Sequence, residues 1–287
     1  AEIREETLVG TTLTVQAIDS TASFGDPGTV SGQIETENGS VIADEAIEIR
    51  IGNRTRTVQT DSNGVFETQY RPRSARLGSQ SVQVEYVPRA DSVYLFDNAT
   101  FMIDVQQVTP DVTSEIAPDT VRYGDRVNVS ASVTVDSIGV DEVPIEFVMG
   151  DTVVARTTTG PNGTVTATVQ VPASVNDGDR QFVARIPYEN RAIAGAQSVD
   201  PVVVVETRTD LSVNASRTDE GVLTRGQLQT AAGTPVADRP VRIRVGDSET
   251  EVVETNQNGS FRTVLADSPT NESVTVTATY DEPSSNL

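Results

Sequence analysis

The chain has 287 residues, with 42 acidic residues against 21 basic ones and a net charge of −21 at pH 7. All basic residues are Arg, and Lys, His, Cys and Trp are absent. This inventory excludes Ser-His-Asp and Cys-His catalysis, His or Cys metal sites, Lys Schiff bases, Lys-Asn isopeptide bonds and disulfides. The negative charge also argues against nucleic acids and anionic membrane surfaces as partners, because their phosphates would be repelled.

The acidic, Lys-free composition is typical of proteins adapted to concentrated salt. Carboxylates are short and strongly hydrated, whereas Lys has a long apolar stem. In molar salt the Debye length falls to about 3 Å, so repulsion among the acidic groups is screened. We therefore predict a halophilic source. The alternative is an ordinary acidic chain that its charge keeps soluble.

The first ten residues match nothing at the start of the later copies except the linkers before them, and they are predicted to be the tail of an upstream segment, within a piece of a longer protein. From residue 11 a pattern of mostly apolar alternate positions occurs three times, which predicts strands with one buried face. The first strand of the three copies contains Leu13, Val15 and Ala17, then Val112, Ser114 and Ile116, then Leu211, Val213 and Ala215. Both intervals are 99 residues (112 − 13 and 211 − 112).

A turn with Gly-Asp follows the first strand in two of the copies. Residues 24–26 are Phe-Gly-Asp and residues 123–125 are Tyr-Gly-Asp, while residues 225–226, Arg-Gly, are aligned with them in the third copy. Because Gly and Asp favour turns, we predict that a second strand starts after each of these sites.

The next strand of each copy ends in glycine and is followed by an Asn-Gly pair. These strands contain Ile47, Ile49, Ile51 and Gly52; Ile145, Phe147, Met149 and Gly150; and Val241, Ile243, Val245 and Gly246. The glycines lie 98 and 96 residues apart (150 − 52 and 246 − 150), a period that matches one β-sandwich domain. The Asn-Gly pairs at residues 63–64, 162–163 and 258–259 predict type I′ hairpins, which need positive φ at both positions.

Further alternating strands complete the copies, with about seven strands in each. The first two copies close with a strand at residues 101–105 and 202–204. After Tyr280 the third copy has only residues 281–287, with one apolar side chain and one Pro, which cannot form such a strand. The third copy is therefore predicted to have an open sheet edge.

The segment Thr-Asp-Ser-Asn-Gly-Val-Phe at residues 60–66, followed by Gly78, Tyr86 and Tyr94, resembles the immunoglobulin-like repeats of invasin-type and other large bacterial and archaeal surface proteins. The other copies carry the same skeleton more loosely. The resemblance covers nearly the whole chain and implies an all-β fold of three tandem immunoglobulin-like β-sandwich domains, the third lacking its closing strand. The expected segments are a tail at 1–10 and domains at 11–106, 107–207 and 208–287.

Acidic residues suggest two kinds of site, and neither is strongly indicated. Residues 61–64, Asp-Ser-Asn-Gly, resemble the start of a calcium loop, but the later ligands are missing and the other copies have Gly160 and Asn256 in place of Asp61. A turn is the stronger interpretation. A glycosidase with two carboxylates stays open in principle, but the acids are scattered, so no catalytic, cofactor or metal residue is predicted.

N-glycosylation sequons are the strongest functional signal. Eight Asn residues begin an Asn-x-Ser/Thr motif, about three times the number expected by chance for this composition. The candidate sites are Asn38, Asn53, Asn98, Asn128, Asn162, Asn214, Asn258 and Asn271. The alternative is that Asn-Gly turns beside Thr-rich strands create the motif incidentally.

These observations favour a non-catalytic stalk, adhesin or cell-envelope module of a haloarchaeal surface glycoprotein, located outside the cell. The alternative is an accessory immunoglobulin-like array of a secreted or membrane-anchored enzyme whose catalytic domain lies outside this sequence. The expected partners are other surface proteins or cell-envelope glycans, with self-association a further expectation. No cofactor, nucleic acid or direct membrane insertion is expected.

Overall fold

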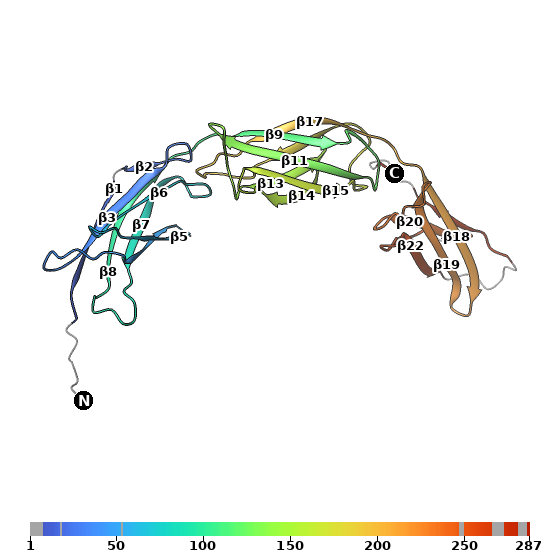
Figure 1. Ribbon diagram of the computed structural model, residues 1–287. Helices are drawn as coiled ribbons and strands as arrows, with labels where there is room; N and C mark the ends of the chain where they lie inside the picture. The colour runs from blue at the N-terminus through green and yellow to red at the C-terminus, as the bar shows by residue number, and fades with distance from the viewer. Residues whose placement is uncertain (1–7, 18, 53, 247–249, 266–272, 281–285) are drawn as a thin grey trace.

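The computed structural model describes residues 8–17, 19–52, 54–246, 250–265, 273–280 and 286–287. All regular secondary structure in these ranges is β-strand, so the predicted all-β class is confirmed. The strands form six sheets, which follow one another along the chain as three pairs. Figure 1 shows the pairs arranged end to end in an arc. We call them the first, second and third unit.

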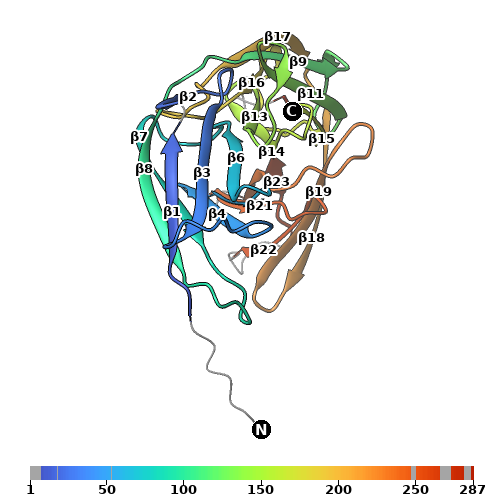
Figure 2. The ribbon, with the colours of Figure 1, turned by 60° about the vertical axis from the view of Figure 1, so that its left-hand side comes forward.

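The first unit consists of a three-stranded and a five-stranded sheet. The smaller sheet has the order β1 (Thr11–Ala17), β3 (Gly28–Thr36), β6 (Val65–Tyr70). The larger sheet has the order β2 (Thr21–Ala22), β8 (Asp97–Val105), β7 (Gly78–Tyr86), β4 (Ala46–Ile51), β5 (Arg54–Gln59). Its strands pair antiparallel except β2 and β8, which are parallel. Figure 2 shows β1, β3 and β6 side by side.

The second unit repeats this arrangement. In one sheet β11 (Arg126–Val135) pairs with β9 (Asp111–Ala117), β12 (Ile138–Gly139) and β15 (Thr164–Gln170). The other has the order β10 (Thr120–Val121), β17 (Gln197–Val204), β16 (Gly178–Arg185), β13 (Pro144–Met149), β14 (Thr152–Thr158).

The third unit has two three-stranded sheets in the described residues. Their orders are β18 (Thr209–Thr218), β19 (Gly221–Thr230), β22 (Ser260–Leu265) and β21 (Glu251–Glu254), β20 (Pro240–Val245), β23 (Val276–Thr279). In the earlier units β8 and β17 pair with β7 and β16, the counterparts of β23, whereas no strand among the described residues pairs with that edge of β23. The predicted lack of a closing strand therefore agrees with the described part of this unit.

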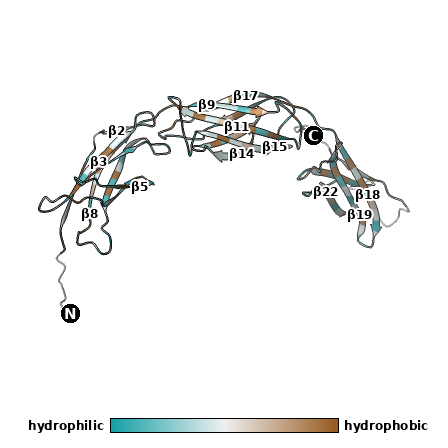
Figure 3. Cartoon of the chain, in the orientation of Figure 1, coloured by the Kyte–Doolittle hydropathy of each residue, from teal (hydrophilic) through white to brown (hydrophobic). Residues whose placement is uncertain are grey.

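Each unit has its own cluster of buried apolar side chains between its sheets. In the first unit Val30 and Ile34 of β3 and Ile47 of β4 are fully buried members of one cluster. Figure 3 shows the matching alternation of apolar and polar residues along the strands. Because burying each such side chain is worth about 1.5–3 kcal/mol, this alternation fixes which face of each strand points inward.

Two glycines inside strands make room for aromatic rings. Gly32 of β3 lies opposite Phe66 of β6, and Gly226 of β19 lies opposite Phe261 of β22. A Cβ on either glycine would collide with the ring. The alignment of residues 225–226 with the Gly-Asp turns of the other copies is therefore wrong, because Gly226 is the counterpart of Gly32 in mid-strand.

The Asn-Gly turns connect the two sheets of a unit and not two paired strands. In the first unit β5 pairs with β4 and β6 pairs with β3, so residues 60–64 cross between the sheets. Gly64, Gly163 and Gly259 have φ values of 72°, 73° and 69°, but the Asn residues before them do not have positive φ. The type I′ prediction is therefore wrong, since that turn needs positive φ at both positions.

The backbone at the start of each unit is hydrogen-bonded to a later segment of the same unit. In the first two units this segment is the loop before β8 or β17, and in the third unit it is the end of the chain. The backbone pairs are Val9 with Tyr94, Val108 with Ile193, and Thr207 with Asn286. In the last pair the Thr207 N–H donates to the Asn286 carbonyl at 2.7 Å, so the end of the chain lies beside the start of the third unit (Figure 1).

Val9 and Gly10 make backbone contacts with the first unit. The Val9 N–H donates to the Val93 carbonyl at 2.8 Å, and the Gly10 carbonyl accepts from the Glu37 N–H at 3.0 Å. We propose the predicted domain boundaries with one change, which is to begin the first domain at Val9.

Candidate functional site

Three segments meet where the first unit joins the second: the loop at residues 71–77, the linker at 106–110 and the loop at 187–196. The Ala192 N–H donates to the Ala75 carbonyl at 2.9 Å, and the Ala192 carbonyl accepts from the Val108 N–H at 2.8 Å. Arg191 also donates through Nη1 to the Ser74 carbonyl at 2.9 Å. The linker is therefore hydrogen-bonded to the second unit through Val108. The second unit is in turn hydrogen-bonded to the loop at residues 71–77 of the first unit.

An aromatic side chain crosses the same junction. Phe24, in the turn between β2 and β3 of the first unit, is 1% exposed and belongs to the buried cluster of the second unit. The guanidinium carbon of Arg71 lies 5.1 Å from the centroid of its ring, within cation–π range. The sequence predicted the turn correctly but gave no sign that its aromatic residue completes the neighbouring core.

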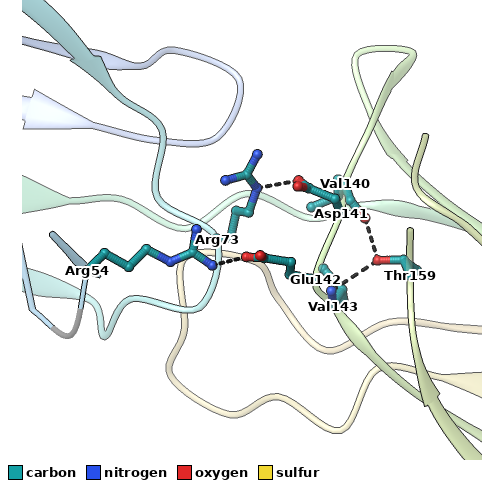
Figure 4. A network of polar contacts seen from close by, with 7 residues as sticks. All are labelled: Arg54, Arg73, Val140, Asp141, Glu142, Val143 and Thr159. Atoms are coloured by element: carbon teal, nitrogen blue, oxygen red, sulfur yellow. Dashed lines mark hydrogen bonds and ion pairs between the residues drawn. The ribbon is translucent and has the colours of Figure 1, made fainter. Parts of the chain in front are cut away.

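Two ion pairs join loops of the two units (Figure 4). Arg54, at the start of β5, pairs with Glu142, and Arg73 Nε lies 2.5 Å from an Asp141 carboxylate oxygen. The Arg73 and Asp141 side chains are each about one quarter exposed, whereas those of Arg54 and Glu142 are about half exposed. The more buried pair is screened less by solvent and salt, so it should contribute more to the junction.

A buried threonine fixes the loop that presents the two acids. Thr159 Oγ1 donates to the Val140 carbonyl at 2.7 Å and accepts from the Val143 N–H at 3.0 Å, bracketing Asp141 and Glu142 (Figure 4). Glu142 has a φ of 57°, a left-handed conformation that is uncommon for non-glycine residues. These two hydrogen bonds hold the loop in the shape that directs both carboxylates toward the first unit.

The same threonine bridge occurs in every unit. Thr60, Thr159 and Thr255 are almost fully buried, and each donates to a carbonyl and accepts from an N–H of the loop before the central strand. Thr60 is the first residue of the motif at residues 60–66, but the sequence alone indicated no role for it or for its counterparts. The available signal was that each threonine lies three positions before the Asn of its Asn-Gly pair.

A cleft of about 550 Å³ lies beside the ion pairs. Its lining includes Tyr70, Arg71 and Arg73 of the first unit and Tyr188 of the second. A second cavity of about 430 Å³, between β5 and β6, shares the first three of these residues. Burial raises the pKa of the Tyr70 and Tyr188 phenols, although nearby arginines lower it in part, so both side chains stay protonated at neutral pH. Guanidinium and phenol donors make the cleft suited to anionic and hydroxyl-bearing groups.

The second junction uses the equivalent aromatic position. Tyr123 packs against the cluster of the third unit, and its hydroxyl donates to the Pro235 carbonyl at 3.1 Å. Its backbone N–H donates to Thr207 Oγ1 in the linker at 3.2 Å. Both junctions are therefore built from the same turn of the preceding unit.

Six of the eight predicted glycosylation sites lie in the described ranges, and all six are exposed: Asn38, Asn98, Asn128, Asn162, Asn214 and Asn258. Asn53 and Asn271 lie outside the described residues. Three of the six are in turns and three on strands, and they are distributed over the three units. Exposure is a requirement for this modification, and glycosylation stays a prediction.

Asp61, which sequence analysis compared with a calcium ligand, caps its own turn. Its Oδ1 accepts hydrogen bonds from the N–H groups of Val65 at 2.9 Å and Asn63 at 2.8 Å. These bonds hold the pKa of Asp61 below its usual value. Asn256 makes the equivalent bonds in the third unit. Within the described ranges, no group of three or more Asp, Glu, His or Cys side chains is placed to hold a metal ion.

Comparison with known proteins supports the fold. Residues 110–203, which cover most of the second unit, match a family model described as an archaeal bacterial Ig-like domain. This match and the paired sheets confirm the predicted immunoglobulin-like fold. A search of curated protein sequences found no significant match. No helix long and apolar enough to cross a membrane occurs among the described residues.

Several solved structures are similar at low sequence identity. A tetra-tandem repeat in the extending region of a large adhesion protein is 20% identical, with 96% of this chain and 71% of that one covered and a TM-score of 0.37. The Yersinia pseudotuberculosis adhesin InvE is 14% identical, with 88% and 73% covered and a TM-score of 0.40. The Escherichia coli adhesin FdeC is 12% identical, with 88% and 86% covered and a TM-score of 0.35.

Proposed function

We propose that this chain is a non-catalytic spacer, serving as a stalk or adhesion module on the outer face of a cell. The observation that carries the proposal is the repeated junction. At the same turn position, Phe24 is buried in the cluster of the second unit and Tyr123 packs against the cluster of the third. Val108 and Thr207, at the same linker position, each donate a backbone hydrogen bond to the unit that they begin.

Such junctions give a chain of small domains the property that a spacer needs. A flexible linker would let neighbouring domains sample many orientations, and their separation would grow only with the square root of linker length. Shared packing and backbone hydrogen bonds restrict the orientations, so extension grows with each added unit. The surface area is consistent with extension: the chain exposes 16405 Å², against about 12,000 Å² for a compact monomer of this mass.

The finer form of the proposal is a halophilic, haloarchaeal surface glycoprotein. Its support is the net charge of −21 without any Lys and the exposure of the six described sequons. Acidic groups keep an extended surface hydrated in concentrated salt, where their mutual repulsion is screened.

Two measurements test this function. Small-angle X-ray scattering of the chain in molar KCl should give the pair-distance distribution of a rod, and a globular distribution would contradict a spacer. Antibodies raised against the chain should label intact source cells, and brief protease treatment of these cells should remove the signal. Labelling only after the cells are opened would contradict a surface location.

A further inference from the structure

The cleft at the first junction concentrates positive charge in a strongly acidic chain. Five of the 21 basic residues of the sequence line it: Arg54, Arg71, Arg73, Arg76 and Arg191. Among the described residues, only Asp141 and Glu142 form ion pairs with these arginines. The cleft therefore has an excess of positive charge although the whole chain carries −21.

Two of these arginines have hydrogen-bonding capacity left for a ligand. The Arg71 guanidinium lies over Phe24, and its buried Nη1 has no hydrogen-bond partner in the described part of the chain. Arg76 is exposed and forms no ion pair there. A buried donor without an acceptor is unfavourable, so an anion that reached Arg71 would relieve that cost.

The fold itself does not require arginine at the edge of the cleft. Arg54 and Arg56 of β5 lie opposite Ile51 and Ile49 of β4. The corresponding partners across β13 and β14 of the second unit are small and uncharged: Met149 faces Thr152, and Phe147 faces Ala155. These two positions of the edge strand can therefore be occupied by uncharged residues, which favours a binding role for Arg54 and Arg56 of the first unit.

The lining fits a sugar that carries acidic groups. Guanidinium groups bind carboxylate or sulfate through paired N–H···O bonds. Tyr70 and Tyr188 add aromatic faces, against which the apolar face of a sugar ring packs, and hydroxyls that can bond sugar hydroxyls. The volume of about 550 Å³ is in the usual range for small-ligand sites. We propose that the cleft binds a short oligosaccharide bearing carboxylate or sulfate groups.

The acidic surface outside the cleft restricts the length of the ligand. A nucleic acid or long polyanion would extend beyond the cleft and be repelled, whereas a short oligosaccharide stays within about one Debye length, roughly 8–10 Å, of the arginines. An acidic oligosaccharide would be the ligand of the surface module proposed above, so this inference rests on that function. Its binding test needs only the purified chain, so failure to bind would leave the rod shape unaffected.

The test is calorimetric titration of the whole chain at about 0.1 M NaCl, where the Debye length is near 10 Å. The probes are trigalacturonate, a sulfated trisaccharide, neutral maltotriose, sodium sulfate and tetraglutamate. The variants are Arg76→Gln, Arg71→Gln combined with Arg76→Gln, and the control Arg126→Gln, which removes the same charge from an exposed position at the start of β11. Because Arg71 contacts Phe24, the double variant could lose stability as well as charge, and thermal melts will show whether it does. In that case the single Arg76→Gln variant alone tests the proposal.

We expect saturable one-to-one binding of at least one acidic trisaccharide and none of maltotriose. Arg76→Gln should weaken that binding at least about fivefold and the double variant at least about tenfold, as the loss of charge-assisted hydrogen bonds implies. Arg126→Gln should stay within about twofold, because it lies outside the cleft. Absence of saturable binding, equal loss with Arg126→Gln, or equally tight binding of sulfate or tetraglutamate would each overturn the proposal.

Discussion

Phe24 and Tyr123 lie 99 residues apart (123 − 24) at the same turn position, and each packs against the hydrophobic cluster of the unit that follows it. The first and second units thus each supply an aromatic residue that packs against the core of the next unit. Burial of this kind couples the stability of adjacent units and restricts the angle between them. The relationship is the structural basis of the proposed spacer.

The turn glycines should be sensitive to a single added methyl group. Gly163 has a φ of 73°, and a Cβ there would collide with the Val133 carbonyl oxygen. Gly163→Ala should therefore lower the free energy of unfolding of the second unit by about 2 kcal/mol or more. The control is Gly160→Ala in the same turn, where a Cβ would make only an ordinary contact at 3.5 Å. Urea unfolding with hydrogen-exchange mass spectrometry reports each unit separately, and equal effects of both variants would refute the strain argument.

The threonine bridge should contribute more than an exposed threonine. Thr159→Val keeps the shape of the side chain but leaves the Val143 N–H and the Val140 carbonyl without their bonds. We expect a loss of about 1–3 kcal/mol in the free energy of unfolding of the second unit. Thr166→Val, at an exposed position of β15, is the matched control and should stay within about 0.5 kcal/mol. A neutral Thr159→Val variant would show that the loop does not depend on this bridge.

Salt should stabilise the fold although it weakens the junction ion pairs. With a net charge of −21, screening of carboxylate repulsion acts over the whole surface, whereas the two junction pairs are local. The melting temperature should therefore rise between about 0.1 M and about 3 M KCl, concentrations that bracket the fall of the Debye length from about 10 Å to below 3 Å. Sucrose at equal osmolality controls for solute exclusion. An unchanged melting temperature in KCl would contradict the halophilic interpretation.

Acid should remove the contribution of one turn carboxylate. Hydrogen bonds from the N–H groups of Val65 and Asn63 lower the pKa of Asp61 in the folded state below 3.8, the ordinary value for an Asp side chain. The stability it adds is therefore present above that value and is lost as the pH falls through the lowered folded pKa. Asp61→Asn keeps an acceptor, as Asn256 does in the third unit, but cannot titrate. The stability difference between wild type and Asp61→Asn in the first unit should shrink from pH 5 to pH 2, whereas a constant difference would rule out this linkage.

Local alternation predicted the strands because burial on one face of a sheet acts on consecutive residues of one strand. The strands around Ile47, Ile145 and Val241 lie where this pattern placed them. Glycine was harder to interpret, since it marks both turns and close packing. The sequence predicts a turn at Gly226, but this residue lies in mid-strand, where the Phe261 ring occupies the space that a Cβ would fill.

The junction could not be predicted because its partners are distant in sequence and belong to different units. Arg54 and Glu142 are 88 residues apart, and nothing near either residue identifies the other. The Asn-Gly turns show the same difficulty at shorter range. Their dipeptide is typical of a hairpin, but the flanking strands belong to different sheets, and only the pairing of β5 with β4 and β6 with β3 reveals this.

The most direct test of the account is the distance distribution between the first two units. The sequence contains no cysteine, so Ser79→Cys and Thr166→Cys, at exposed positions of β7 and β15, can each carry a spin label. Pulsed electron paramagnetic resonance then measures the distances between the two labels. We predict one narrow distribution for this chain, clear broadening on adding Phe24→Ser, and no change on adding Phe96→Ser, which alters a phenylalanine that is 52% exposed. A distribution as broad without Phe24→Ser as with it would contradict a junction held by this residue.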